Sequence, residues 1–573
     1  MLGPCIIWLC ILFFIPIAIL FGRTFYDPQI GLNTENIHRI LTTEAYLAIM
    51  SITVKIALSV TLIVIVTAYP IAYYIASSEG RNSLLTLVLL PFWTSYLVRI
   101  FAWLALLGRN GLINNLLQYL HITDSPLKLV YTYQGVLIGM VHALIPLAVL
   151  TMYANMKNIP QVLRESAFTL GSSRVQTFWR IYFPLSFSGV TAAALMVFII
   201  ALGFFTTPAL LGSAKETMIT LVVVDMLHTS LNWGLAGAIA ILMLFTAMGA
   251  VYVYQKIFGL TAVTGFREEQ KESAINIFIG NFARATGIAF LRFIGSFFDY
   301  ISKALEMVAK RTSKMVFKLG FTGVFFVLIT FLVVPMFVLF PVSISESKFL
   351  EWPPRGFTFH WYTSYFGNPI WISAIARSFV VASITGVIAT VIGFPAAIIL
   401  VRERFPLKNM LITMITAPMI LPHIILAISL FYAYSKVRLV GTTIGLVLGH
   451  TALAIPFVVI TVSSVLRNYD QQLDQAAMIL GAPPLVVFRR ITFPLLASGV
   501  FAGFFFAFIT SFDELTVALF VTGGLMSTLP KLMWADALDQ VSPGLAAISV
   551  VIFAVLTIAL FVMFQMKKPR KTV

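Results

Sequence analysis

Long apolar runs, separated by short polar segments, make up most of this chain. The runs are continuously apolar rather than alternating, which favours membrane-spanning helices over the strands of a barrel. Each run is long enough to cross about 30 Å of hydrocarbon as a helix. The pattern therefore predicts an all-α integral membrane protein with about twelve transmembrane helices, at residues 2–22, 46–77, 84–108, 134–156, 187–212, 232–258, 317–343, 373–401, 407–435, 439–466, 496–522 and 544–566.

One polar stretch occurs twice. Residues 165–190 align without a gap with residues 475–500, at a constant offset of 310. An internal duplication of this kind predicts two homologous six-helix halves, residues 1–258 and 317–573. Twelve of the 26 aligned positions are identical, and in the first copy they are Ala167, Leu170, Gly171, Phe178, Arg180, Ile181, Phe183, Pro184, Leu185, Ser188, Gly189 and Val190.

Each copy lies between the fourth and fifth predicted spans of its half, in loops 160–187 and 470–497. A short helical piece ends at Gly171 in the first copy, and the matching glycine is Gly481. Glycine suits the left-handed position just after a helix. A second piece ends at Phe-Pro, where the next span begins. This pattern is typical of a cytoplasmic loop that carries short helices.

Composition agrees with the membrane class. Hydrophobic residues make up 60% of the chain, charged residues 10%, and the mean hydropathy is +0.96. The first span has no basic start and no small-residue cleavage pattern, so we expect a retained helix rather than a signal peptide. Cys5 and Cys10 both lie in it and support neither a disulfide framework nor a metal site.

The net charge of +16 comes from Lys and Arg residues that flank the spans. That distribution indicates membrane topology rather than nucleic-acid binding, and it places both repeated loops and both termini in the cytoplasm. No Gly-Lys pair occurs, so the chain has no phosphate-binding loop of its own. The seven histidines are scattered. We therefore expect no catalytic residue, no metal site and no cofactor in this chain.

Residues 259–316 join the two halves. They begin with a charged segment and continue as a mixture of Phe, Ile, Lys and Arg residues. Such a segment indicates a cytoplasmic or interfacial amphipathic helix rather than a thirteenth span. A linker between two once-separate subunits is the simplest interpretation, and a regulatory segment is the alternative.

The repeated loops resemble the EAA loop of the membrane subunits of ABC importers. In that family the loop docks into a groove of the cytoplasmic ATPase and transmits its motion. Glu165 matches the family's acid, whereas Gln475 replaces it in the second copy, next to Asp474. The arginines Arg180 and Arg490 either face acids of the ATPase or bind lipid phosphates. The resemblance implies ATPase coupling through Glu165, Ala167, Gly171, Arg180, Pro184, Gln475, Ala477, Gly481, Arg490 and Pro494.

Asp513 and Glu514 stand together inside the eleventh predicted span. A carboxylate at the centre of a span costs about 2.5–3.5 kcal/mol on insertion scales, so such residues usually face a cavity or a partner. The matching position in the first half is Gly203, so the acid pair belongs to one half only. The pair predicts a site for a cationic substrate. The alternative is that both carboxylates bond to polar groups of neighbouring spans.

Several segments resemble the two permease subunits of the spermidine/putrescine importers, in the family's order. Residues 91–99, 107–114 and 207–212 are similar to the first subunit, and residues 511–514 and 520–523 are similar to the second. The resemblance implies a type I ABC importer permease with both subunits fused in one chain, in a bacterial inner membrane. Permeases for ferric iron, thiamine, 2-aminoethylphosphonate or opines share the general pattern.

A polyamine needs carboxylates and aromatic faces for its ammonium groups. Trp93 and Tyr96 are candidates for the faces, and Asp225 and Asp536 for an outer vestibule that attracts cations. Arg99 would instead suit an anion, although we expect it to anchor a span end at the interface, as we do for Arg109.

The resemblance also implies partners: two copies of a cytoplasmic ABC ATPase that bind the ATP, and a periplasmic or lipid-anchored solute-binding protein. Membrane lipids surround the chain, and no nucleic acid is expected. An ion-driven secondary carrier is the alternative class. Such a carrier would show intramembrane acids in both halves, or broken helices at matching positions.

Overall fold

The computed structural model of this chain describes residues 2–27, 31–78, 81–92, 94–258, 296–297, 300, 313–523 and 526–566. Most of them are helical, as the long apolar runs predict, because a backbone in hydrocarbon must satisfy its own hydrogen bonds. The two strands are short and antiparallel, β1 (Tyr26–Asp27) and β2 (Gly31–Leu32). The expected linker 259–316 lies almost entirely outside the described residues.

The first half begins with two helices, a π-helical turn at Cys10–Phe14 between them, and a short third helix. Its α-helices are α1 (Gly3–Leu9), α2 (Ile15–Phe25), α3 (Glu35–Thr42), α4 (Glu44–Ser77), α5 (Arg81–Phe92), α6 (Tyr96–Leu107), α7 (Leu112–Tyr119), α8 (Tyr133–Met156), α9 (Gln161–Thr169), α10 (Arg174–Thr177), α11 (Phe183–Leu202), α12 (Thr206–Leu211), α13 (Ile219–Thr229) and α14 (Trp233–Phe258).

The second half repeats this order after a longer first helix. Its α-helices are α17 (Ser313–Ser343), α18 (His360–Gly367), α19 (Pro369–Arg402), α20 (Lys408–Ile420), α21 (His423–Val437), α22 (Thr443–Leu466), α23 (Gln472–Ile479), α24 (Pro484–Val487), α25 (Phe493–Phe512), α26 (Thr516–Val521), α27 (Leu529–Asp539) and α28 (Pro543–Met566).

A bundle of three long helices forms the centre of each half. Helices α4, α8 and α11 pack together in the first half, and α19, α22 and α25 pack together in the second. Glycines at the contacts let the helices approach closely. A Cβ on Gly499 of α25, for example, would lie 2.8 Å from the side chain of Val465 on α22.

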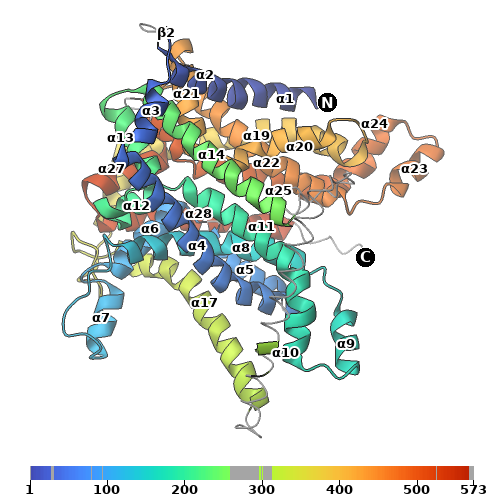
Figure 1. Cartoon of the computed structure of the whole chain (residues 1–573), viewed down its shortest axis with the longest axis horizontal. Helices are drawn as coiled ribbons and strands as arrows, with labels where there is room; N and C mark the ends of the chain where they lie inside the picture. The colour runs from blue at the N-terminus through green and yellow to red at the C-terminus, as the bar shows by residue number, and fades with distance from the viewer. Residues whose placement is uncertain are drawn as a thin grey trace.

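The first helix of each half packs against the other half. Helix α2 contacts α21 as well as α14 of its own half, and α17 contacts α4, α5 and α6 as well as α28. The largest buried apolar cluster accordingly contains residues from both halves, such as Leu9, Trp371 and Leu426. Figure 1 shows α1 and α2 lying along α19 and α21. The two halves therefore share a core.

Among the described residues, ten helices are long and apolar enough to cross a membrane, or eleven if the bent pair α20–α21 counts as one span. Sequence predicts about twelve. The difference arises because the ninth expected span bends by 94° between Ile420 and His423, and the third is divided between α5 and α6. In the last helix, α28, only the stretch Pro543–Ile558 enters this count, and it is shorter than a full span.

Breaks therefore occur at matching positions of the two halves, where sequence predicts continuous spans. The third span of each half is interrupted at residues 93–95 and 421–422, and the fifth at 203–205 and 513–515. Pro91 and Pro418 precede the first two interruptions, and proline removes a backbone donor from a helix. The apolar pattern gives no sign of these breaks, because the residues on both sides of each remain mostly apolar.

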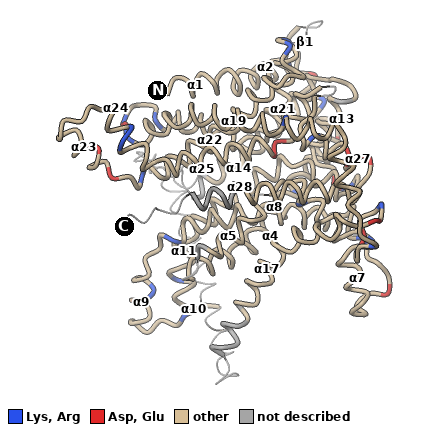
Figure 2. Tube along the Cα trace, turned by 180° about the vertical axis from the view of Figure 1, so that it is seen from behind, with Lys and Arg blue, Asp and Glu red and all other residues tan. Residues whose placement is uncertain are grey.

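Both repeated loops project from one end of the molecule. Figure 1 shows α9 and α10 there, with α23 and α24 beside the start of α1 and apart from the first pair. Figure 2 shows Lys and Arg positions along both loops at this end, whereas Asp and Glu positions occur mainly around α7, α13 and α27 at the other end. This asymmetry agrees with the charge bias in the sequence.

Candidate functional site

The two repeated loops have the same backbone. Helix α9 ends at Thr169, Leu170 is its C-cap, and Gly171 follows with φ of +83°; in the second loop Gly481 has φ of +87°. The N–H groups of Gly171 and Ser172 donate to the carbonyls of Phe168 and Ala167, which is a Schellman motif. The same bonds recur around Gly481. The predicted left-handed glycines are thus present in both copies.

A π-helical turn precedes the Phe-Pro pair in each copy, at Phe178–Tyr182 and at Phe488–Thr492. Proline cannot donate to the carbonyl four residues earlier, and its ring crowds that carbonyl. A wider turn before Pro184 and Pro494 accommodates both effects, so the helix continues into α11 or α25 without a gap. Sequence predicts a loop here, whereas the structure shows one helix from Arg174 to Leu202.

The short helices of both loops expose apolar side chains. Leu170 is 86% exposed and Val162 is 65% exposed in the first loop, and Leu480 is 88% exposed and Ile479 is 85% exposed in the second. Such side chains at the ends of a membrane protein indicate a surface that binds another protein. Arg180 and Arg490 are exposed in the same loops.

The acid positions of the two loops differ. Glu165 and Gln475 are both exposed on their short helices. Asp474 is buried, with Oδ1 accepting hydrogen bonds from Tyr469 (2.5 Å) and Thr492 (2.8 Å), and Oδ2 pairing with Arg402 at 2.8 Å. Asp474 therefore does not replace the missing exposed acid, because its carboxylate faces its own half.

Burial by itself would raise the pKa of the Asp474 carboxyl. The hydrogen bonds from Tyr469 and Thr492 and the charge of Arg402 outweigh that effect, so the pKa lies below its usual value. In the first loop the matching pair is Arg164 and Tyr182, and the guanidinium carbon lies 5.8 Å from the ring centroid. The same two positions thus contact each other in both loops, by a cation–π contact between Arg164 and Tyr182 in the first and by a hydrogen bond from Thr492 to Asp474 in the second.

A cavity of about 310 Å³ lies between the two halves, at the four helix breaks. Its wall includes residues beside each break, namely Phe92, Tyr96, Gly203, Phe204, Leu421, Pro422, Asp513 and Glu514. Half-helix ends at a cavity are a common way for a transporter to bring backbone polar groups to a substrate. The predicted acid pair is therefore at the wall of this cavity.

The Asp513 carboxylate is bound by the start of α6, which belongs to the other half. Oδ1 accepts hydrogen bonds from Ser95 Oγ at 2.6 Å and from the N–H of Tyr96 at 3.1 Å, and Oδ2 lies 3.0 Å from the same N–H. Sequence shows no basic partner for this acid. Its partner is a helix N-terminus, where unpaired N–H groups favour an anion.

The Glu514 carboxylate is bound within its own half. Oε2 accepts a hydrogen bond from the N–H of Val517 at 2.7 Å and lies 3.9 Å from His450 Nε2. Oε1 lies 3.9 Å from Nδ1 of His423, a side chain that is 44% exposed and also lines the cavity. His450 is fully enclosed and contacts Ser511 Oγ at 2.8 Å.

Tyr96 and Arg99 also line the cavity. The Arg99 guanidinium lies 5.4 Å from the Tyr96 ring centroid and donates to the carbonyl of Ala143 at 3.1 Å. The prediction that Arg99 anchors a span end at the membrane interface is therefore wrong, since its side chain is buried in the protein. Arg109, by contrast, is exposed.

The remaining predicted pathway residues lie away from this cavity. Asp225 is exposed on α13, and Asp536 on α27 accepts a hydrogen bond from the Tyr365 hydroxyl at 2.7 Å. Trp93 lies outside the described residues. That Asp225 and Asp536 form an outer vestibule therefore stays a prediction. Among the described residues, no group of three or more His, Cys, Asp or Glu side chains could hold a metal ion.

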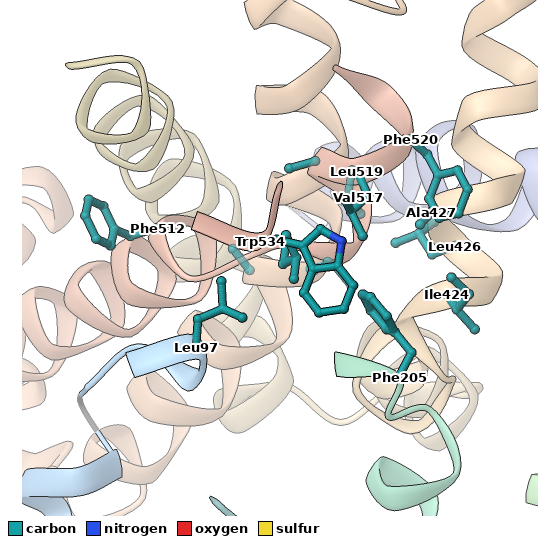
Figure 3. Packing of buried hydrophobic residues seen from close by; sticks show 14 of the residues in the cluster. Leu97, Phe205, Ile424, Leu426, Ala427, Phe512, Val517, Leu519, Phe520 and Trp534 are labelled. Carbon is teal, nitrogen blue, oxygen red and sulfur yellow. The ribbon is translucent and has the colours of Figure 1, made fainter. Parts of the chain in front are cut away.

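Apolar side chains from both halves pack beside the cavity. Figure 3 shows the Trp534 indole next to Phe205, and the two ring centroids are 5.5 Å apart. Phe205 and Leu97 also line the cavity wall, so the packing and the cavity share side chains. Phe205 comes from the first half and Trp534 from the second. The helix breaks are therefore held in place across the interface between the halves.

A family model decides what kind of protein this is. The model for the binding-protein-dependent transport system inner membrane component matches the chain twice, at residues 68–259 and 389–573. The chain belongs to this family. It is therefore a multi-pass inner-membrane component of a binding-protein-dependent transport system, with two family domains in one chain.

Its relatives are permease proteins of polyamine transport systems. The chain is 31% identical over 255 residues to the spermidine/putrescine transport system permease protein PotB of Escherichia coli (strain K12), covering 43% of this chain and 92% of PotB. The putrescine permease protein PotI of the same strain is 32% identical over 241 residues (41% and 85% covered). PotC of Haemophilus influenzae is 31% identical over 245 residues (42% and 93%).

A solved bacterial alginate ABC transporter in complex with alginate pentasaccharide-bound periplasmic protein is also similar, at 19% identity and a TM-score of 0.40. The match covers 44% of this chain and 91% of the matched chain.

Sequence reasoning missed three residues beside the predicted sites. Ser95, His423 and Arg402 contact Asp513, Glu514 and Asp474, respectively. Each comes from a different segment than its partner. The hypothesis that matched helix breaks would mark a secondary carrier was also wrong, because this permease-family chain has them in both halves.

Proposed function

We propose that the chain is the complete translocation unit of an ATP-driven importer for polyamines such as putrescine and spermidine. The observation that carries the proposal is the cavity between the halves, whose wall contains the Asp513 and Glu514 carboxylates. A polyamine is a flexible polycation, and carboxylates in a low-dielectric cavity attract ammonium groups. The polyamine permease relatives support the same substrate class.

In this proposal, two copies of a cytoplasmic ATPase dock on α9 and α23 and bind the ATP, and the chain itself holds no cofactor. A periplasmic or lipid-anchored binding protein delivers the polyamine at the opposite end. Both termini lie in the cytoplasm. The exposed leucines at 170 and 480 and the exposed arginines at 180 and 490 in the same loops support this arrangement. Nucleotide binding shifts the equilibrium between inward and outward access, because it favours one arrangement of the halves.

The substrate test is ATP-dependent uptake of radiolabelled putrescine and spermidine into proteoliposomes that contain the chain with its cognate ATPase and binding protein. We expect uptake by the native chain and strong loss in Glu514→Gln. Uptake of neither polyamine by the native complex would reject the substrate class.

The docking test compares single charge substitutions at matched exposed sites. We expect Leu170→Asp and Leu480→Asp each to reduce co-purification of the ATPase, since a carboxylate in an apolar contact is left desolvated. Ile122→Asp is the control, because Ile122 is 64% exposed and lies just after α7, which Figure 1 shows at the other end of the molecule. Equal co-purification in all three variants would reject α9 and α23 as the docking sites.

A zwitterionic solute such as 2-aminoethylphosphonate is the second candidate, because Arg99 also lines the cavity. A guanidinium binds phosphonate or carboxylate groups well. Excess unlabelled 2-aminoethylphosphonate in the uptake assay separates the two candidates. Competition with a polyamine would favour the zwitterion, and its absence favours the polyamine.

A further inference from the structure

Two contacts between the halves occupy equivalent positions. The break of the fifth span leaves Gly203 in the first half and Asp513 in the second, 310 residues apart. Each contacts the start of the helix that follows the break in the third span of the other half. A Cβ on Gly203 would lie 3.1 Å from the Pro422 side chain, before α21, whereas Asp513 bonds to Ser95 and Tyr96 at the start of α6.

The two contacts differ in chemistry. Gly203 and Pro422 meet by van der Waals contact alone, because neither has a polar side chain. Asp513 accepts hydrogen bonds with both carboxylate oxygens, from one hydroxyl and one backbone N–H. A carboxylate that is bonded in this way at a helix N-terminus already has its charge compensated. The bond across the halves is therefore much stronger at Asp513.

Glu514 is in a different situation, although it is the next residue. Its hydrogen bond comes from Val517 in its own half. Its neighbours at ion-pair distance are imidazoles, His423 and His450, and His423 is exposed beside it in the cavity. The Glu514 carboxylate, like that of Asp513, lies at a helix N-terminus, the start of α26. Because that helix belongs to its own half, Glu514 stays at the cavity wall whether or not the halves separate, and it remains available there to an incoming cation.

We propose that the two adjacent carboxylates have separate roles: Glu514, beside His423, binds the substrate ammonium, while Asp513 is a latch that ties the second half to α6 of the first. The Glu514 role rests on the proposed polyamine function. The Asp513 role rests only on the contact between the halves. A transport cycle that separates the two halves at the cavity has to break the Asp513 bonds to Ser95 and Tyr96.

The first experiment uses the complete complex of chain, ATPase and binding protein in proteoliposomes. We expect Asp513→Asn and Ser95→Ala to raise ATP hydrolysis in the absence of substrate about threefold, because the latched arrangement is less favoured. Ser95→Ala should keep the KM for uptake within about twofold of the native value. Glu514→Gln should instead raise that KM about tenfold.

Opposite outcomes overturn the assignment. If Asp513→Asn raised KM as much as Glu514→Gln without changing substrate-free hydrolysis, Asp513 would be a ligand and not a latch. A Glu514→Gln variant with native KM would remove Glu514 from the binding site. Size-exclusion profiles and ATPase co-purification establish that each variant is folded and assembled.

A second experiment needs no substrate affinity. Ser95→Cys and Asp513→Cys are combined in a chain whose Cys5 and Cys10 are replaced by Ala. We expect an oxidised bridge to stop ATP hydrolysis and a reductant to restore it. Unchanged hydrolysis with the bridge closed would show that the halves do not separate here and would reject the latch. Because hydrolysis reports on the latch, an absence of polyamine uptake would reject the proposed substrate and the Glu514 role alone.

Discussion

The two repeated loops have nearly the same backbone but are fixed to the membrane part in different ways. Gly171 and Gly481 end the short helices in the same left-handed conformation, and a π-helical turn precedes each Phe-Pro pair. Asp474, however, is tied to Arg402 at the end of α19, whereas its counterpart Arg164 only stacks on Tyr182. Residues that set backbone geometry are retained in both copies, while side chains that anchor the loop have diverged.

Different contacts join the two loops to the membrane helices. The Arg402–Asp474 ion pair joins α23, the short helix of the second repeated loop, to α19 of the central bundle. The residue of α4 that matches Arg402 by its place at the end of the helix is Ser77. The second loop is therefore joined to the membrane bundle by an ion pair, whereas the first loop is joined to it by ring packing and by the hydrogen bond between Tyr69 and Ser186.

The largest expected effect is the loss of folding stability when Asp474, the anchor of the second loop, is removed. Asp474→Ala leaves the Arg402 guanidinium and two hydroxyls without their acceptor, which should cost about 2–3 kcal/mol of folding stability. Arg164→Ala removes a cation–π contact and should cost about 0.5–1 kcal/mol. Thermal unfolding of both variants in detergent measures the difference. Equal melting temperatures would mean that the two loops are anchored equally.

A second comparison concerns the breaks in the fifth spans. Gly203→Val places a side chain against Pro422, since even a Cβ would lie 3.1 Å from that ring. Overpacking of this kind should cost about 1–3 kcal/mol. Gly249→Val is the matched control, because a Cβ there meets no atom within 4 Å. Thermal unfolding again gives the result, and a Gly203→Val chain as stable as the control would contradict the close contact.

The left-handed glycines that follow the short helices of the repeated loops permit a test of backbone conformation, with a smaller expected effect. A Cβ on Gly481 would have no neighbour within 4 Å, so only the positive φ opposes substitution. Gly481→Ala should cost about 1–2 kcal/mol locally, and Gly481→Asn less, because Asn tolerates this conformation. ATP-dependent uptake and ATPase co-purification should fall more for Ala than for Asn. The reverse order would show that something other than φ selects glycine.

The smallest expected effect is a pH dependence at Asp474. Its pKa lies below the ordinary value of about 3.9, so the charged carboxylate stabilises the folded state above that pH. This stabilisation is lost as the pH falls through the pKa of the folded state. The melting temperature of the native chain should therefore exceed that of Asp474→Asn at neutral pH, and the gap should narrow below about pH 4. A gap that is constant with pH would exclude the ionised Asp474 as its source.

Much of the fold follows from local features of the sequence. The duplicated stretch and the left-handed glycines are present where the residues predict them, and each Phe-Pro pair follows a π-helical turn. Local backbone chemistry fixes them, because a positive φ selects glycine and proline limits what precedes it. The interruptions after Phe92 and Leu202 were not predictable in this way, because the residues on both sides of them remain mostly apolar.

The partners of the charged residues depended on tertiary structure. Sequence placed Asp513 and Glu514 in a span and left open whether they bind a substrate or neighbouring groups. The structure separates them: α6 of the other half binds Asp513, and Glu514 faces two imidazoles from α21 and α22. In the same way, only the fold shows that Asp474 is buried against Arg402 while Gln475 is exposed beside it.

The sequence by itself determined that this chain is a duplicated, all-helical membrane protein, and the family match confirms its two domains. Hydrophobic length and repeated residues are properties of single segments, so they can be read along the chain. Which half-helix meets which carboxylate was decided by the packing of one half against the other. A helix N-terminus attracts an acid only when the fold brings the two together, and residues 95 and 513 are brought together by that packing alone.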